Sequence, residues 1–398
     1  MKSVVAVKDV LKENRTRLYR NLVANTITKN LSLLLSDSTE ENWMDAFYAL
    51  ELIRYQPPWV SAKVLQAFSV ASQQSTDFQI SLLELAKANY PLQLENEVQS
   101  LLNETLSDKA FAACAEYLLI ANPLLQNDLV ANAAIRMLQP HDTILMKQLR
   151  QRLYQNKNNI TAVSLKQLLH HPFFAGAKIV FSLQRKNRDF PGLALVRDSA
   201  GHFVKDANGF IFSVPQLARS ITNMPFYFRN GNTPQGIFRM FGIAVSRSNF
   251  IGPTPNIQLT MPFETSIAHF MNDSSIQDSV WTAAQYKKLL PPLWQNNEAI
   301  IETFYAGKIG RNEIIAHGTT VNPAYYVNQS YYPQTPTLGC LCTKEIWNEE
   351  DGSILLSDQQ HLIAALQKAG GADGYLVVIE LDDKRKAVDI EEAMQFLE

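Results

Sequence analysis

Cysteine is scarce in this chain, with 3 residues in 398. Three thiols are too few for the disulfide framework that stabilises small secreted domains. Cys114 lies in the apolar helical run AFAACAEYLLIA, where a free cysteine ordinarily behaves as an inert core residue. Any chemistry that needs a thiol is therefore expected at Cys340 and Cys342, which stand together in Gly-Cys-Leu-Cys.

Long hydrophobic runs and a strong net charge are also missing. No stretch approaches the roughly 20 consecutive apolar residues of a membrane-spanning helix. The N-terminal stretch MKSVVAVKDVLKENRTRLYR carries a charge every few residues, which is not typical of a signal peptide. The formal net charge of −2 gives no general reason to bind nucleic acid or an acidic membrane surface. Length and composition instead predict a folded protein of two or three domains.

The first 170 or so residues are poor in glycine and have helical periodicity. Three amphipathic segments resemble one another and end at Pro57, Pro91 and Pro123, which are 34 and 32 residues apart. That spacing falls in the range of helix-pair repeats, although no named repeat signature is met. We expect either a short α-solenoid or a helical bundle without repeat ancestry, over residues 1–172.

The pattern changes near residue 172, where short β-branched and aromatic runs alternate with turn signals. Residues 173–398 are predicted to form a β-rich domain with a helical insertion at about 274–307, so the fold class is two-domain α+β. The expected strands are AKIVFSL, LALVRD, GFIFSVP, the strand before His317 in RNEIIAHGTT, and GYLVVIEL, and SDQQHLIAALQKAGG is expected to be a helix.

His317 follows an apolar run in His-Gly-Thr, and Cys340 follows Gly339 further along the chain. A cysteine nucleophile needs a base or cation near its sulfur and N–H donors for the oxyanion, and these residue types meet that need. Two unreactive thiols beside a core histidine are an alternative of similar weight. A zinc half-site is less favoured because Cys-x-Cys is not the usual ligand spacing, and a Cys340–Cys342 disulfide would close a strained ring.

The stretch HGTT…TPTLGCLC resembles the catalytic motif of the L,D-transpeptidase family, His-Gly-Thr followed by Ser/Thr-x-Gly-Cys. Upstream, NGNTPQGIFRM is similar to the Thr-Pro-x-Gly-x-Phe hairpin of the same domain, and LALVRDSAGHF to its opening strands. The resemblance covers about residues 175–390. It implies a β-sandwich-like catalytic core that acts on peptidoglycan stem peptides without a metal or organic cofactor.

The same resemblance implies roles for individual residues. Cys340 is the expected nucleophile, His317 its base, and Gly339 with Cys340 the oxyanion donors. Residues expected to shape the substrate pocket are Gly318, Thr319, Thr337, Leu338, Tyr331 and Tyr332. The implied reaction is attack on the carbonyl before D-alanine in a tetrapeptide stem, through a thioester that an amine or water resolves.

Departures from the family pattern leave other functions open. Cys342 stands where the family usually has Arg or Asn, and Leu338 where many members carry a second histidine. The loop between His317 and Cys340 is long and rich in tyrosine, which suits a lid or sugar-stacking wall but more often reflects packing beneath a loop. An L,D-carboxypeptidase or related hydrolase, and a catalytically degenerate scaffold that binds peptidoglycan or a protein, are the alternatives.

The resemblance also sets expectations for location and partners. Peptidoglycan lies in the cell envelope, so the expected location is periplasmic or envelope-associated, with an export signal that the given chain does not show. Peptidoglycan stem peptides are the expected partners, together with a possible protein partner for the helical domain. Nucleic acid is not an expected partner, and membrane association is expected only through a signal or anchor that the given chain does not show.

Overall fold

The computed structural model describes residues 7–138, 143–154 and 161–397, so the first six residues of the N-terminal stretch lie outside it. The chain divides into two compact units. The helical unit comprises Glu13–Lys157 and Ile221–Gly231, and the barrel unit comprises Met1–Lys12, Asn158–Ser220 and Asn232–Glu398. The sequence placed a boundary near residue 172, whereas the last helix before that point belongs to the barrel unit and residues 221–231 belong to the helical unit.

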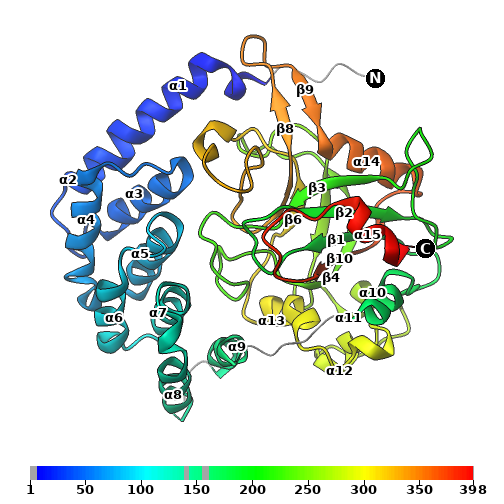
Figure 1. Ribbon diagram of the computed structural model, residues 1–398, viewed down its shortest axis with the longest axis horizontal. Helices are drawn as coiled ribbons and strands as arrows, with labels where there is room; N and C mark the ends of the chain where they lie inside the picture. The colour runs from blue at the N-terminus through cyan, green and yellow to red at the C-terminus, as the bar shows by residue number, and fades with distance from the viewer. Residues whose placement is uncertain (1–6, 139–142, 155–160, 398) are drawn as a thin grey trace. The chain divides into compact units, whose positions relative to one another are not determined.

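The helical unit contains the helices expected from the repeated segments (Figure 1). Their bounds, with those of the neighbouring helices, are α1 (Lys12–Asn21), η2 (Leu22–Thr28), α2 (Lys29–Ser32), α3 (Glu40–Ile53), α4 (Pro58–Phe68), α5 (Thr76–Asn89), α6 (Glu95–Glu104), α7 (Asp108–Ala121), η4 (Pro123–Leu125), α8 (Gln126–Arg136) and α9 (Thr143–Leu153). The short 3-10 turns are η1 (Lys8–Val10), in the barrel unit, and η3 (Ala71–Gln73).

Helices α3, α5 and α7 stack on one another in sequence order, with α4 and α6 packed beside them. The side chains of Ser75 and Ser107 cap α5 and α7 by accepting the N–H groups of Phe78 and Ala110. Each of the three helices ends shortly before its proline, because proline removes a backbone donor and restricts the residue before it. The helical character predicted from the sequence is thus present in the structure, where α3, α5 and α7 begin at Glu40, Thr76 and Asp108.

The barrel unit is built on a closed barrel of strands in the order β1-β10-β4-β5-β6-β7-β3-β2. Their bounds are β1 (Lys178–Gln184), β2 (Gly192–Arg197), β3 (Ser213–Leu217), β4 (Gly236–Ala244), β5 (Asn256–Thr260), β6 (Ile315–His317), β7 (Leu341–Thr343) and β10 (Asp373–Glu380). A separate antiparallel pair is formed by β8 (Glu345–Trp347) and β9 (Ile354–Ser357).

Closure of the barrel differs from the β-sandwich-like core that the family resemblance implied. Strand β1 pairs with β2 on one side and, in parallel, with β10 on the other, so the first and last strands of the barrel complete it. This pairing leaves no free edge on the sheet, which a two-sheet sandwich would have. Phe181, Leu195 and Val377 from these three strands are buried in its main hydrophobic core.

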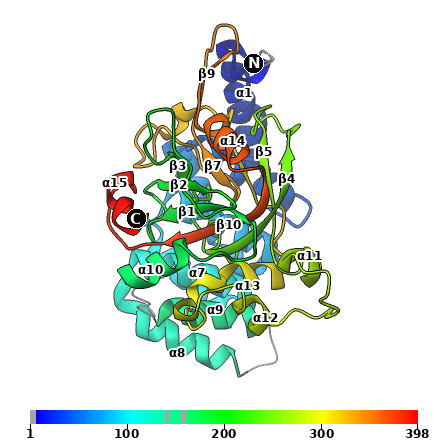
Figure 2. The ribbon, with the colours of Figure 1, turned by 90° about the vertical axis from the view of Figure 1, so that its right-hand side faces the viewer.

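The helical insertion and the helix before the last strand, both predicted from the sequence, are present in the barrel unit. The insertion between β5 and β6 holds α11 (Ile267–Met271), α12 (Ala283–Lys287), η5 (Pro292–Trp294), η6 (Ala299–Ile301) and α13 (Glu302–Lys308), and α14 (Asp358–Lys368) precedes β10. The helix α10 (Ala162–Leu169) packs against α15 (Ile390–Leu397), and both lie on the same side of the barrel (Figure 2). A short helix, η7 (Pro323–Tyr326), lies in the loop between β6 and β7.

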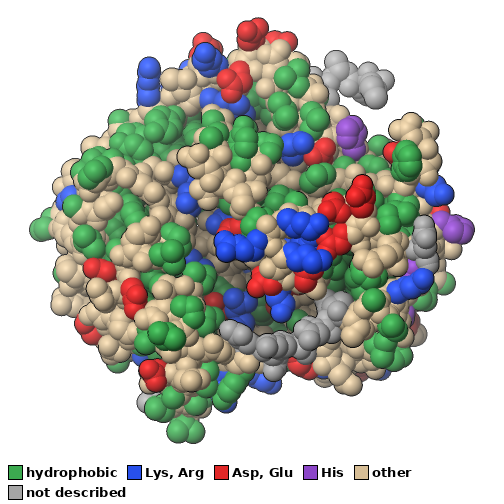
Figure 3. Space-filling model, in the orientation of Figure 1, with side chains coloured by type: hydrophobic (Ala, Val, Ile, Leu, Met, Phe, Trp, Pro, Cys, Tyr) green, Lys and Arg blue, Asp and Glu red, His purple; other side chains and the backbone are tan. Residues whose placement is uncertain are grey.

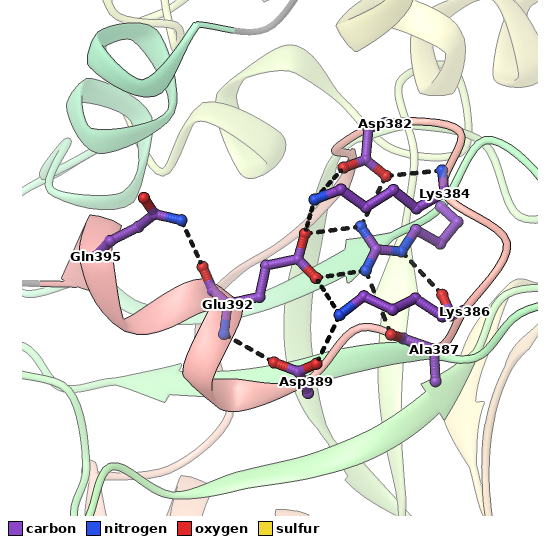
Figure 4. A network of polar contacts seen from close by, with 8 residues as sticks. Asp382, Lys384, Lys386, Ala387, Asp389, Glu392 and Gln395 are labelled. Carbon is purple, nitrogen blue, oxygen red and sulfur yellow. Dashed lines mark hydrogen bonds and ion pairs between the residues drawn. The ribbon is translucent and has the colours of Figure 1, made fainter.

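The segment that joins β10 to α15 is fixed by the buried guanidinium of Arg185, the residue that follows β1. Arg185 donates to Asp382 at 2.7 Å and to Glu392 at 2.5 Å, and Lys384 and Lys386 extend the ion-pair network around Glu392 (Figure 4). Basic and acidic side chains gather side by side over this segment (Figure 3). Paired charges of both signs indicate a structural clamp on the C-terminal helix rather than a binding patch of one sign.

Candidate active site

Strands β6 and β7 bring the two expected catalytic motifs together. They pair in parallel, with Ala316 opposite Leu341 and His317 opposite Cys342. Cys340 directly precedes β7 and therefore lies beside Ile315, two positions before His317. Two positions correspond to about 7 Å along a strand. The long loop that leaves β6 after His317 thus returns the chain to the neighbouring strand, with Cys340 beside Ile315.

The Cys340 side chain is half-buried, and its sulfur is bound to backbone groups. It accepts the N–H of Ile315 at 3.5 Å and donates to the carbonyl of Glu313 at 3.7 Å. Neither partner is the imidazole of His317. Within the described residues the thiol and the imidazole lie on neighbouring strand positions and make no direct hydrogen bond.

The turn before the cysteine is held by side-chain hydrogen bonds. Thr337 Oγ1 accepts the Gly339 N–H at 3.0 Å and donates to the Cys340 carbonyl at 2.8 Å. Thr233 Oγ1 donates to the Gly339 carbonyl at 2.8 Å. Gly339 has φ 121°, a conformation that favours glycine because it has no Cβ.

These bonds decide which N–H groups an oxyanion can use. The Gly339 N–H, an expected donor, is already bound to Thr337. The Cys340 N–H makes no hydrogen bond within the described residues. The Cys340 N–H is accordingly the donor that an oxyanion could use without breaking a hydrogen bond of the described residues. Thr337 instead stabilises the turn.

The imidazole of His317 is buried and neutral. Burial lowers the pKa of His317 to about 4, and Nδ1 contacts the carbonyl of Gly318. Because a carbonyl oxygen only accepts, we assign the ring proton to Nδ1. The other ring nitrogen, Nε2, is then unprotonated and has the character of a base.

Gly318 and Thr319, expected pocket residues, lie against a buried carboxylate. A Cβ at Gly318 would be 2.2 Å from the Glu345 carboxyl carbon, so any larger residue there would have to displace this carboxylate. Glu345 accepts the Thr319 N–H at 2.9 Å and the Ser357 hydroxyl at 2.7 Å. Burial raises the pKa of Glu345 to about 7. Thr319 is 4% exposed, which indicates a role in anchoring the His317 strand end rather than an open substrate contact.

The tyrosines of the long loop divide into buried and exposed groups. Tyr326 and Tyr331 are buried and pack on each other and on Leu217, with the Arg219 guanidinium 4.7 Å from the Tyr331 ring centre. Tyr332 is 46% exposed and Leu338 is 45% exposed. Tyr331 is therefore part of the loop's own core, and Tyr332 and Leu338 are the expected pocket residues whose side chains are available to a ligand.

Cys342 and Cys114 are buried and unpaired by disulfides. Cys342 lies in β7, donates to the Thr343 carbonyl at 3.6 Å, and has its thiol pKa raised by burial. Burial likewise raises the pKa of Cys114. Among the cysteines, Cys340 alone is partly accessible.

Arg311 is a charged neighbour of the site that the sequence did not single out. Its side chain is buried, and its Nη1 donates to the Asn232 carbonyl at 2.7 Å. Burial raises the pKa of the Cys340 thiol, while the Ile315 N–H and the charge of Arg311 oppose that rise. Burial also lowers the pKa of Arg311 to about 10, against the influence of Cys340 and Glu302. In RNEIIAHGTT nothing in the spacing distinguishes this arginine from an ordinary surface charge.

The described residues contain no group of His, Cys, Asp and Glu arranged to hold a metal ion, and no helix among them is long and apolar enough to cross a membrane. No protein-family model, curated protein or solved structure matches the chain. Functional inference therefore depends on the residues around Cys340.

Proposed function

We propose that the chain is a cysteine acyltransferase of the L,D-transpeptidase type, acting on peptidoglycan stem peptides, and that its barrel unit is the catalytic domain. The observation that supports this most is the parallel pairing of β6 and β7, which puts His317 opposite Cys342 and so two positions along the pair from Cys340. An accessible thiol, a neutral buried imidazole and a free backbone N–H are the parts that acyl transfer through a cysteine needs.

The resting pair in this proposal is a neutral thiol and a neutral imidazole. The Cys340 sulfur first leaves the Glu313 carbonyl, and its proton passes to Nε2 of His317. The sulfur then attacks the carbonyl carbon that joins the L-centre of the third stem residue to D-alanine. A carbon–sulfur bond forms, and the carbonyl oxygen takes the negative charge.

The oxyanion of this intermediate is stabilised by the Cys340 N–H, and Arg311 adds positive charge nearby. Collapse of the intermediate breaks the carbon–nitrogen bond, and His317 returns its proton to the leaving amine of D-alanine. The product is a thioester between Cys340 and the tripeptide stem. An amine from a neighbouring stem resolves it to an L,D-crosslink, and water resolves it to a free tripeptide.

Hydrolysis is a second candidate, supported by the position of Cys342. In the L,D-transpeptidase family this place usually holds Arg or Asn, whereas here a small side chain is buried in β7 with a raised thiol pKa. A buried thiol offers no charge or amide to orient an incoming amine. An L,D-carboxypeptidase or related hydrolase would need only water at this point.

Incubation with purified disaccharide-tetrapeptides, followed by mass spectrometry, tests the proposal. A crosslinked dimer supports transpeptidation, and a disaccharide-tripeptide with released D-alanine supports hydrolysis. Cys340→Ala is the matched control and should abolish either product. Unchanged substrate with folded wild-type protein would contradict both enzymatic proposals and leave the binding scaffold, in the cell envelope, as the function.

A further inference from the structure

The segment Ile221–Gly231 interrupts the barrel unit and belongs to the helical unit. It is compact, because Phe228 and Gly231 donate their N–H groups back to Pro225 and Phe228 at 3.0 Å. A Cβ at Gly231 would lie 1.9 Å from the Pro225 carbonyl oxygen. Thr222 Oγ1 donates to the Asn230 carbonyl at 2.8 Å and closes the segment on itself. We call residues 221–231 the strap.

The strap is anchored on the helical stack through two carboxylates. The buried Tyr227 hydroxyl donates to Glu116 on α7, and the Asn230 amide donates to Glu84 on α5 at 3.3 Å. Burial alone would raise the pKa of Glu116, but Arg152 at 2.7 Å and Lys87 at 3.9 Å lower it overall. A charged, buried acceptor makes the hydrogen bond from Tyr227 stronger than a neutral one would be.

The residues on either side of the strap belong to the barrel unit and contact the nucleophile turn and Arg311 there. At the outgoing end, Ser220 forms a parallel bridge with Thr337, and its N–H donates to the Asn232 side chain at 2.8 Å. At the returning end, the Asn232 carbonyl accepts Arg311, and Thr233 Oγ1 binds the Gly339 carbonyl. The residues that flank the strap therefore hold the turn before Cys340 and the cation beside it.

We propose that the strap is a positioning element for the turn that presents Cys340, with Tyr227 and Asn230 as the positioning residues that hold the strap in its fold. The inference rests on the proposed role of Cys340 as nucleophile.

Loosening the strap should weaken the contacts that favour the thiolate. The Ile315 N–H and Arg311 both lower the pKa of the Cys340 thiol against the effect of burial, and both depend on where the turn lies. A displaced turn loses part of each contact. The thiol then reacts more slowly at a given pH, and its reactivity profile moves to higher pH.

The test compares Tyr227→Phe with Tyr117→Phe in the full chain. Tyr117 is the residue after Glu116 on α7, is equally buried, and its hydroxyl bonds the Tyr90 carbonyl at 2.6 Å and the Leu94 N–H at 2.9 Å without touching the strap. Each variant is treated with iodoacetamide across a range of pH, alkylation of Cys340 is followed by peptide mass spectrometry, and thermal unfolding is measured in parallel. Asn230→Ala serves as a milder second variant if Tyr227→Phe does not fold.

We expect alkylation of Cys340 to slow about threefold to tenfold in Tyr227→Phe, the factor for loss of one buried hydrogen bond, with its profile shifted to higher pH. Tyr117→Phe should lower thermal stability and leave the Cys340 rate and profile unchanged. Equal profiles in Tyr227→Phe and the wild type would overturn the proposal, and so would equal slowing in Tyr117→Phe. Because alkylation needs no peptide substrate, a negative muropeptide result would count against the proposed function and not against the strap.

Discussion

His317 and Cys342 stand opposite each other in the parallel pair of β6 and β7. This register puts the buried thiol of Cys342 in the sheet and leaves Cys340, two residues earlier, at the end of the strand where the turn exposes it. The imidazole faces a carbonyl at Nδ1 and is kept neutral by burial. The two cysteines of Gly-Cys-Leu-Cys are thus separated into one buried and one partly accessible thiol.

Acidification should destabilise the wild-type protein through His317. The unfolded chain protonates this histidine below about pH 6.5, whereas the folded protein does not until about pH 4. Between these values the unfolded state binds more protons, so stability falls as the pH falls. His317→Gln removes this contribution. Between pH 7.5 and pH 5, the unfolding free energy of the wild type should fall by about 2 kcal/mol more than that of the variant.

Urea unfolding of both proteins at the two pH values measures this difference directly. The comparison with His317→Gln cancels groups that titrate alike in both proteins, such as Glu345. A difference between wild type and variant that does not change with pH would mean that His317 is protonated in the folded state, against its buried, neutral assignment.

Thr337→Val should impair the enzyme more than it destabilises the fold. The substitution keeps the shape of the side chain and removes both hydrogen bonds that hold the Gly339-Cys340 turn. We expect muropeptide turnover to fall about tenfold, equivalent to ~1.4 kcal/mol. Thr337→Ser retains the hydroxyl and should keep most of the activity. Equal loss in both variants would show that the methyl group, not the hydroxyl, is what matters.

Arg311→Gln should raise the pKa of the Cys340 thiol, because it removes the positive charge that opposes the effect of burial. The rate of iodoacetamide alkylation at pH 8 is expected to fall by a factor of about three to ten. Arg311→Lys keeps the charge and should recover part of the rate. An unchanged alkylation rate in Arg311→Gln would show that Arg311 does not influence the Cys340 thiol.

Cys342→Arg would restore the residue type usual in L,D-transpeptidases, yet we expect it to unfold the barrel unit. Cys342 is 1% exposed in β7, and an unpaired guanidinium there would be buried without a partner, at a cost of more than about 3 kcal/mol. Cys342→Ala, the size-reducing control, should cost about 1–2 kcal/mol. If Cys342→Arg is as thermally stable as the wild type, the side chain at position 342 must reach solvent, and this position could then serve as the Arg position of L,D-transpeptidases does.

Local sequence patterns predicted the positions of helices and strands better than the way the strands pair. The alternating apolar runs before residues 184 and 317 are strands, and the Ser-Asp start and Gly-Gly stop bound α14, because these signals act within a few residues. The parallel pairing of β1 with β10 depends on residues almost 200 positions apart, and no local signal encodes it. The closed barrel, which replaces the sandwich that the family resemblance implied, depends on this long-range pairing.

The candidate site shows the same limit. His317 and Cys340 were found because glycine and threonine neighbours give them a recognisable motif. Arg311 and the strap were not singled out from the sequence, since the contacts on which their proposed roles rest, Arg311 with Asn232 and Tyr227 with Glu116, join segments that are distant in the chain. Tyr331 was expected in the pocket and lies in the core of its own loop, because tyrosine spacing alone does not tell the two apart.

The central claim is that Cys340 forms an acyl-enzyme, and its most direct test is acylation by a carbapenem, a thiol-reactive β-lactam. Intact-mass measurement of the wild type should show one added carbapenem, located at Cys340 by peptide mapping. Cys340→Ala should show none, and Cys342→Ala should be labelled like the wild type. Unlabelled wild-type protein with an intact fold, or labelling that persists in Cys340→Ala, would contradict the account.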